Sequence, residues 1–155
     1  MRDVQAWLDE YDVSHRNPTN KRIHWVCVPA IVLSVVALLW TLPAPARFAD
    51  ISPLMNWGTL FLLAALVYYF ILSFSLAIGM AVVTAAMILA INALSALPLP
   101  LWQIAVAVFV VAWIGQFIGH HIEGKRPSFL TDLQFLMIGP LWLLAQLYRR
   151  LGIPY

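Results

Sequence analysis

WGTLFLLAALVYYFILSFSLAIGMAVVTAAMILAINALSAL, residues 57–97, decides the fold, because these 41 residues include no charged side chain. One helix of this length would rise about 60 Å, twice the roughly 30 Å hydrocarbon core of a bilayer. The chain must therefore turn back inside the stretch. Ser73-Phe74-Ser75 is the predicted turn, and it divides the stretch into membrane spans at 57–73 and 75–97.

The composition extends this interpretation to the whole chain. Of its 155 residues, 63% are hydrophobic and 10% are charged, against roughly 45–50% and 25% in soluble domains. Proline pairs bound two further apolar runs, which predict spans at 23–42 and 101–119. The sequence thus predicts an all-α integral membrane protein with about four transmembrane helices in a single domain, residues 1–155.

The two ends of the chain differ from these spans. Residues 1–16 predict an amphipathic helix on the membrane surface, with apolar residues at i, i+3, i+4 and i+7: Val4, Trp7, Leu8 and Tyr11. Asn17 followed by Pro18 predicts an N-cap and the start of the next helix. Residues 130–148 are shorter than a span and contain Gly139-Pro140, so we expect an interfacial or re-entrant helix there.

Charge supports this topology. With four crossings, eight of the nine Lys and Arg residues share one face, the cytoplasmic one by the positive-inside rule, and only Arg47 lies opposite. The basic residues lie beside apolar runs as topology signals do, which makes nucleic acid an unexpected partner. The single cysteine, Cys27, excludes a disulfide framework and a cysteine-based metal site.

All four histidines flank the predicted spans. His15 and His24 precede and open the first span, and His120 and His121 close the fourth. An even number of crossings separates the two pairs, so both reach the same interface. On a helix, Gln116, His120 and Glu123 share one face, and His121 is turned away from it by about 100°.

These positions allow His24 and His120 to converge with His15 on a metal ion. Glu123, Gln116 and Asn20 are then further ligands or partners that fix the imidazole tautomers. Such ligands suit Fe(II), Zn(II) or Cu(II). The alternative is a set of interfacial histidines that bind lipid headgroups. Lys125 and Arg126 are topology signals that can also hold a substrate carboxylate.

Two stretches of the sequence resemble the signatures of the membrane 2-hydroxy fatty acid dioxygenases, a family with yeast endoplasmic-reticulum and bacterial members. The first runs Tyr11-Asp12-Val13-Ser14-His15, then Asn17-Pro18-Thr19-Asn20 and His24. The second is residues 119–127, GHHIEGKRP. The resemblance extends over nearly the whole chain, in length, span number and the Gly139-Pro140 step.

This resemblance implies an enzyme that shortens long-chain 2-hydroxy fatty acids by one carbon, with Fe(II) as cofactor and O2 as co-substrate. It implies His15, His24 and His120 as metal ligands with Glu123 close by, and we assign Glu123 and His121 as candidate catalytic residues. The lipid tail is expected between the helices, in a bacterial plasma membrane or the endoplasmic reticulum. The rival functions are a zinc-dependent lipid hydrolase and a non-enzymatic membrane helper or transport protein.

Overall fold

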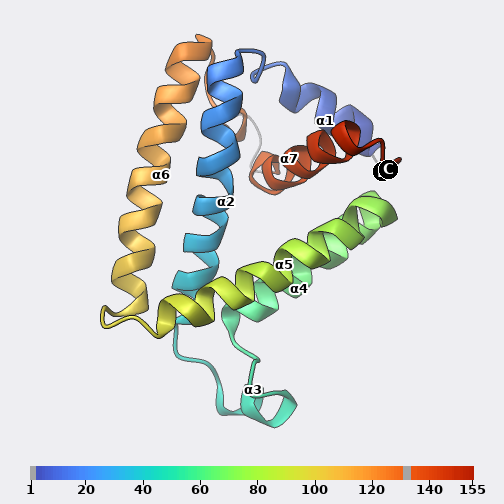
Figure 1. Ribbon diagram of the computed structural model, residues 1–155. Helices are drawn as coiled ribbons and strands as arrows, with labels where there is room; N and C mark the ends of the chain where they lie inside the picture. Colours follow the sequence, from blue (N-terminus) through green and yellow to red (C-terminus); the bar gives the residue numbers. More distant parts are fainter. Residues whose placement is uncertain (1–2, 131–133) are drawn as a thin grey trace.

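The computed structural model describes residues 3–130 and 134–155, and all regular elements in these ranges are helices, as predicted. Figure 1 shows their arrangement. In chain order they are α1 (Val4–Asp12), α2 (Pro18–Trp40), α3 (Ala46–Ile51), α4 (Trp57–Leu72), α5 (Phe74–Ser95), α6 (Leu101–Glu123), the short 3-10 helix η1 (Ser128–Leu130) and α7 (Phe135–Leu151).

Helices α2 and α6 form a long antiparallel pair (Figure 1). Their backbones approach closely because α6 presents glycine to α2. A Cβ on Gly115 would lie 2.5 Å from the sulfur of Cys27, and one on Gly119 would overlap the side-chain oxygen of Asn20. Small residues four apart are a common means of packing helices in membranes. This packing brings the start of α2 against the end of α6, where the histidines lie.

The turn predicted within the uncharged stretch is confirmed at Ser73. Ser73 ends α4 and caps α5, since its backbone is extended (φ −161°) and its hydroxyl oxygen accepts a hydrogen bond from the Leu76 N–H at 3.3 Å. Helices α4 and α5 pack as an antiparallel pair across the far end of α2 (Figure 1). The observed helices agree with the predicted ranges within two residues at each end.

Three of the four predicted spans have the length and composition needed to cross a membrane. In the described residues, α2, α5 and α6 are long and apolar enough to cross a membrane. Helix α4 has 16 residues and rises about 24 Å, short of the roughly 30 Å core. The membrane character is supported, and the predicted count of four is not confirmed. Helix α2 begins at Pro18, as predicted from Asn17-Pro18, and α6 continues past the predicted span end at residue 119 to Glu123.

Helices α1 and α7 pack together beside the start of α2. The four residues of the predicted apolar face of α1 are buried, as expected. Helix α7 continues through Gly139 and Pro140 and buries eight residues against its neighbours. Asp12, at the end of α1, joins the three elements, since it accepts a hydrogen bond from Trp142 of α7 at 3.3 Å and pairs with Lys21 of α2 at 3.4 Å. The position of α7 relative to the membrane stays a prediction.

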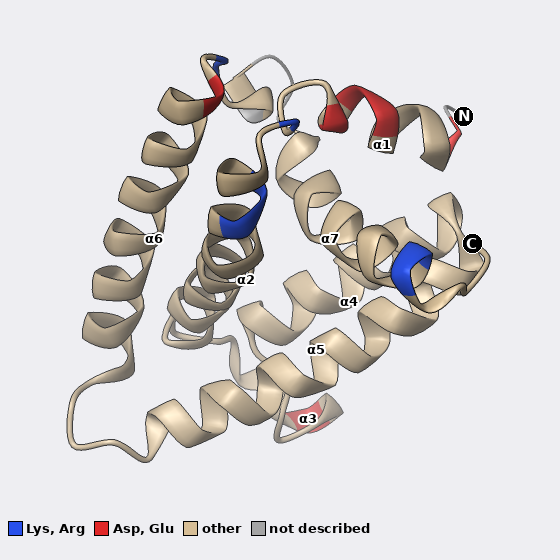
Figure 2. Cartoon of the chain, turned by 45° about the horizontal axis from the view of Figure 1, so that its top comes forward, with Lys and Arg blue, Asp and Glu red and all other residues tan. Residues whose placement is uncertain are grey.

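Charged residues gather where α1, α2 and α6 meet, and long uncharged helices extend away from this end (Figure 2). The N-cap predicted here is confirmed, because the Asn17 side-chain oxygen accepts hydrogen bonds from the backbone N–H of Thr19 at 2.8 Å and of Asn20 at 3.5 Å. The short helix α3, which was not predicted, lies at the opposite end and also bears acidic charge (Figure 2).

Candidate metal centre

Three histidines from separate parts of the chain meet at the charged end of the molecule. His15 lies between α1 and α2, His24 is on α2 and His120 is in the last turn of α6. One ring nitrogen of each lies within 4.8 Å of the others. Their exposed fractions are 0%, 1% and 5%. The structure thus brings together the three residues predicted as metal ligands.

The hydrogen bonds of His15 and His24 fix their tautomers. Nδ1 of His15 lies 2.6 Å from the Tyr11 carbonyl oxygen, and Nδ1 of His24 lies 3.0 Å from the Asn20 carbonyl oxygen. A carbonyl only accepts, so each Nδ1 bears the hydrogen and each Nε2 keeps a lone pair. The two Nε2 atoms are nevertheless 2.9 Å apart. Two acceptors at this distance repel each other unless a cation binds both.

The spacing of these nitrogens fits a metal ion. Metal–imidazole bonds of about 2.0–2.1 Å that meet at a right angle place two nitrogens about 2.9 Å apart, and a tetrahedral angle places them about 3.4 Å apart. Nδ1 of His120 is also buried, and no described residue bonds to it. The donor set is therefore three imidazoles with nitrogen atoms available, which suits a divalent transition metal.

Burial keeps the ring of His15 neutral. Loss of solvent lowers the pKa of His15 to about 4, and the hydrogen bond to the Tyr11 backbone opposes this shift only in part. A histidine must lose its second proton before it can bind a metal ion. At neutral pH, His15 is therefore ready to act as a ligand without a proton to release.

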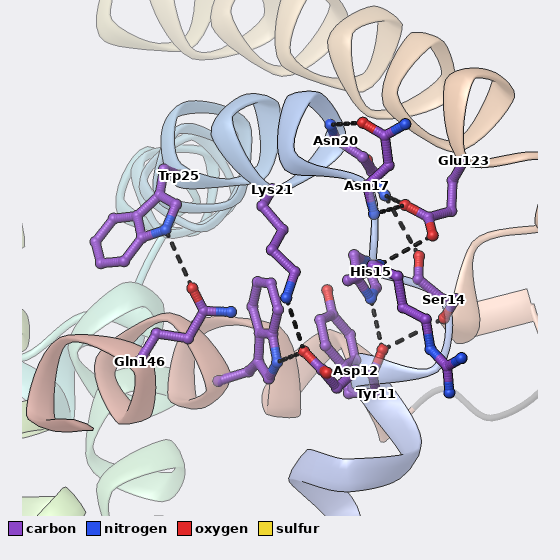
Figure 3. A network of polar contacts seen from close by, with 12 residues as sticks. Tyr11, Asp12, Ser14, His15, Asn17, Asn20, Lys21, Trp25, Glu123 and Gln146 are labelled. Atoms are coloured by element: carbon purple, nitrogen blue, oxygen red, sulfur yellow. Dashed lines mark hydrogen bonds and ion pairs between the residues drawn. The ribbon is translucent and has the colours of Figure 1, made fainter. Parts of the chain in front are cut away.

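Glu123 binds the chain segment that bears His15. One oxygen of its carboxylate accepts the backbone N–H of Arg16 at 2.9 Å. The other oxygen accepts the N–H of Asn17 at 2.8 Å and the side-chain amide of Asn20 at 3.1 Å. Figure 3 shows the carboxylate directed at this segment. Glu123 thereby fastens the end of α6 to the start of α2.

Asn20 connects this carboxylate to the histidines. It is fully buried. Its side-chain amide also donates to the Ser14 carbonyl oxygen at 3.3 Å, and its backbone carbonyl oxygen accepts a hydrogen bond from Nδ1 of His24. Contacts of this kind fix the orientation of metal-binding imidazoles. Asn20 and Glu123 therefore occupy orienting positions, since the hydrogen bonds of the Glu123 carboxylate go to Arg16, Asn17 and Asn20.

A small cavity of about 50 Å³ adjoins the histidines. Such a volume holds only a few water molecules. Its polar lining comes from Tyr11, His24, Gln116, Ser128 and His120, and the remainder is mainly apolar surface of α2, α6 and α7. Gln116 therefore lies beside the cavity, one turn before His120. A long acyl chain can enter here only if the helices move apart.

A second hollow opens on the outer surface at the end of α6. Its lining includes His121, Lys125 and Arg126, and His120 lines both hollows. His121 is exposed and lies outside the three-histidine cluster. The Lys125 ammonium group donates to the Val13 carbonyl oxygen at 2.9 Å. The predicted carboxylate-binding residues thus lie next to the histidines but at the surface.

Tyr11, the first residue of the first signature stretch, lies at the site although no site role was predicted for it. Its ring stacks on His15 with centroids 4.1 Å apart and an angle of 10°, and its carbonyl oxygen fixes the His15 tautomer. Burial raises the pKa of Tyr11 above its ordinary value, so its hydroxyl remains protonated. Its place in the apolar face of α1 indicated only a core residue. The four-residue spacing from His15 was the available signal.

Comparison with known proteins identifies the family. A family model described as 2-hydroxy-palmitic acid dioxygenase Mpo1-like matches residues 1–151. The chain is 25% identical over 152 residues to the 2-hydroxy-palmitic acid dioxygenase MPO1 of Saccharomyces cerevisiae, a match that covers 97% of this chain and 82% of the yeast protein. No solved structure gives a significant match. The chain belongs to the Mpo1-like family.

Proposed function

We propose that this protein is an Fe(II)-dependent dioxygenase that shortens long-chain 2-hydroxy fatty acids by one carbon. Membership of the Mpo1-like family supports the reaction. The observation that carries the cofactor assignment is the pair of facing Nε2 atoms of His15 and His24, 2.9 Å apart. This separation suits two ligands of one metal ion, and membership of a dioxygenase family favours iron over zinc.

In this proposal the chain's own residues hold and orient the centre. His15, His24 and His120 bind Fe(II), which supplies the reactivity toward O2 needed to cleave the bond between C1 and C2 of the substrate. Asn20 and the Tyr11 carbonyl fix the two imidazole tautomers. Glu123 holds the segment of His15 in place, and the apolar walls of the cavity restrict water.

The two hollows that share His120 in their linings match the two ends of a hydroxy acid. We assign the polar end to the outer hollow, where His121, Lys125 and Arg126 attract the carboxylate. The acyl tail then extends past the inner cavity between apolar helices. The Lys125 ammonium group must leave the Val13 carbonyl to contact substrate, and its exposure makes its contribution modest.

The membrane supplies the substrate. We propose that α2, α4, α5 and α6 all cross the bilayer, with α4 at locally reduced thickness, and that the histidines lie at the cytoplasmic face. The clustering of eight of the nine basic residues on one predicted face supports this orientation. A lipid with its tail among the helices presents its polar head at the depth of the histidines.

Turnover by purified protein tests the proposal. We expect Fe(II)-loaded protein in air to convert 2-hydroxypalmitic acid to the fifteen-carbon acid, as detected by mass spectrometry. Palmitic acid and 3-hydroxypalmitic acid should be unchanged, because neither presents a hydroxyl at C2 to complete a chelate with the carboxylate. Equal turnover under argon would contradict the proposal. Ester hydrolysis by zinc-loaded protein would favour a hydrolase, and absence of bound metal would favour a non-enzymatic role.

A further inference from the structure

The hydroxyl group of Tyr11 lies at the wall of the inner cavity. Tyr11 lines this cavity together with Gly139 of α7. A Cβ added to Gly139 would lie 3.0 Å from the Tyr11 hydroxyl oxygen, so the glycine leaves room for the group. The side chain as a whole is only 6% exposed. A buried phenol therefore ends in the space next to the histidines.

This hydroxyl has an unused capacity for hydrogen bonding. The Tyr11 carbonyl binds His15 and its ring stacks on the same residue. Among residues 3–130 and 134–155, no hydrogen bond is formed by the Tyr11 hydroxyl. Tyr11 lines the cavity, so a ligand that enters it can accept a hydrogen bond from this hydroxyl. The free donor is rigidly held, because the ring is fixed between His15, Phe135 and Trp142.

The order of the two hollows indicates which substrate atom meets this donor. The outer hollow is basic and the inner cavity is mainly apolar, with His120 in the wall of both. A hydroxy acid with its carboxylate outside directs the next carbon, C2, inward. Tyr11 lies on the inner side, against α7, whereas Lys125 and Arg126 line only the outer hollow.

We propose that the Tyr11 hydroxyl donates a hydrogen bond to the 2-hydroxyl oxygen of the substrate and thereby selects 2-hydroxy acids over unsubstituted acids. This inference rests on the proposed function and specifies how the same site recognises its substrate. A donor aimed at a substrate hydroxyl is left without a partner when an acid lacking that hydroxyl binds. Discrimination then follows from the lost hydrogen bond.

The test compares two tyrosine variants in iron-loaded, full-length protein. Tyr11→Phe removes the hydroxyl but keeps the ring that stacks on His15 and the carbonyl that orients it. Tyr69→Phe is the matched control, since the buried Tyr69 hydroxyl donates to the Met137 carbonyl oxygen at 2.8 Å, outside the cavity lining. Equilibrium binding of 2-hydroxypalmitic and palmitic acids is measured in detergent under argon, together with the iron content.

For Tyr11→Phe we expect unchanged iron content, about tenfold weaker binding of the 2-hydroxy acid and unchanged binding of palmitic acid. Tyr69→Phe should bind both acids as the unmodified protein does. Equal preference for the 2-hydroxy acid in Tyr11→Phe and unmodified protein would overturn the inference, as would equal weakening of both acids. If the unmodified protein itself shows no preference, the proposed function fails instead.

Discussion

Glu123 offers a quantitative test of how the metal centre is organised. Its carboxylate accepts three hydrogen bonds from the segment that bears His15, at 2.9, 2.8 and 3.1 Å. Each contributes about 1 kcal/mol net at a partly exposed position. Together they stabilise the metal-binding arrangement of this segment by about 3 kcal/mol. Their loss lowers the population able to bind metal and so weakens the apparent affinity.

Two substitutions separate an orienting role from direct ligation. Glu123→Ala removes all three bonds, so we expect iron affinity to fall about 100-fold, because 1.4 kcal/mol corresponds to a factor of ten. Glu123→Gln keeps an oxygen for Asn17 and Asn20 and loses only the bond from Arg16. Its iron affinity should fall by about fivefold.

Competition with a chelator of known affinity measures both variants. Asp50→Ala is the control, since Asp50 is exposed on α3 at the opposite end of the molecule, and it should bind iron as the unmodified protein does. Circular dichroism checks that the helices persist. If Glu123→Gln loses iron as completely as His24→Ala does, Glu123 is a ligand and the orienting role is refuted.

The remaining predictions concern ligands, packing and topology. Replacing any one of the three clustered histidines by alanine should remove most of the iron and leave the helix content unchanged; full retention in all three variants would contradict the ligand set, as elemental analysis can show. Gly119→Ala should lower thermal stability by about 1–3 kcal/mol, because the added methyl overlaps Asn20 where α2 and α6 meet; an unchanged unfolding midpoint would mean that the helices separate freely. Cysteine labelling after Tyr155 and beside Arg126 should report the cytoplasmic face for both, and opposite faces would mean that α7 crosses the membrane.

The helices were predictable because length and periodicity constrain them strongly. An uncharged stretch twice as long as a bilayer needs must turn, and the serines at residues 73 and 75 mark the position. The amphipathic face of α1 follows from spacing alone. The short α3 was missed because six residues between prolines give no usable period. The length of α4 was predicted to within one residue, because Ser73 marks its end.

The three-histidine cluster was foreseen from topology, whereas its supporting contacts were not. Sequence position placed His24 and His120 near one interface. The Glu123 carboxylate accepts hydrogen bonds from backbone N–H groups in an irregular segment. Such a segment has no periodicity from which the direction of its N–H groups can be predicted. Stacking of Tyr11 on His15 similarly depends on a turn between two helices. The Gly-x-x-x-Gly spacing of residues 115–119 was a readable signal for the close approach of α2 and α6.

The position of His121 illustrates the limit of helical geometry. A turn of about 100° from His120 correctly separated the two side chains, and the structure places His121 in the outer hollow. Helical spacing predicts that His121 points away from the site of His120, but it does not predict which other surface His121 lines. The surface hollow depends on Lys125, Arg126 and Pro127, which follow the helix after Gly124 adopts a left-handed conformation (φ 71°).

The most direct test of the central claim combines metal analysis with isotopic labelling. Untagged protein purified without chelators should contain one iron per chain. Incubated with 2-hydroxypalmitic acid under ¹⁸O2, it should yield a fifteen-carbon acid with one ¹⁸O atom in its carboxylate, and no label when ¹⁸O is supplied only as water. Stoichiometric zinc without iron, or label that enters from water alone, would contradict an iron-dependent dioxygenase.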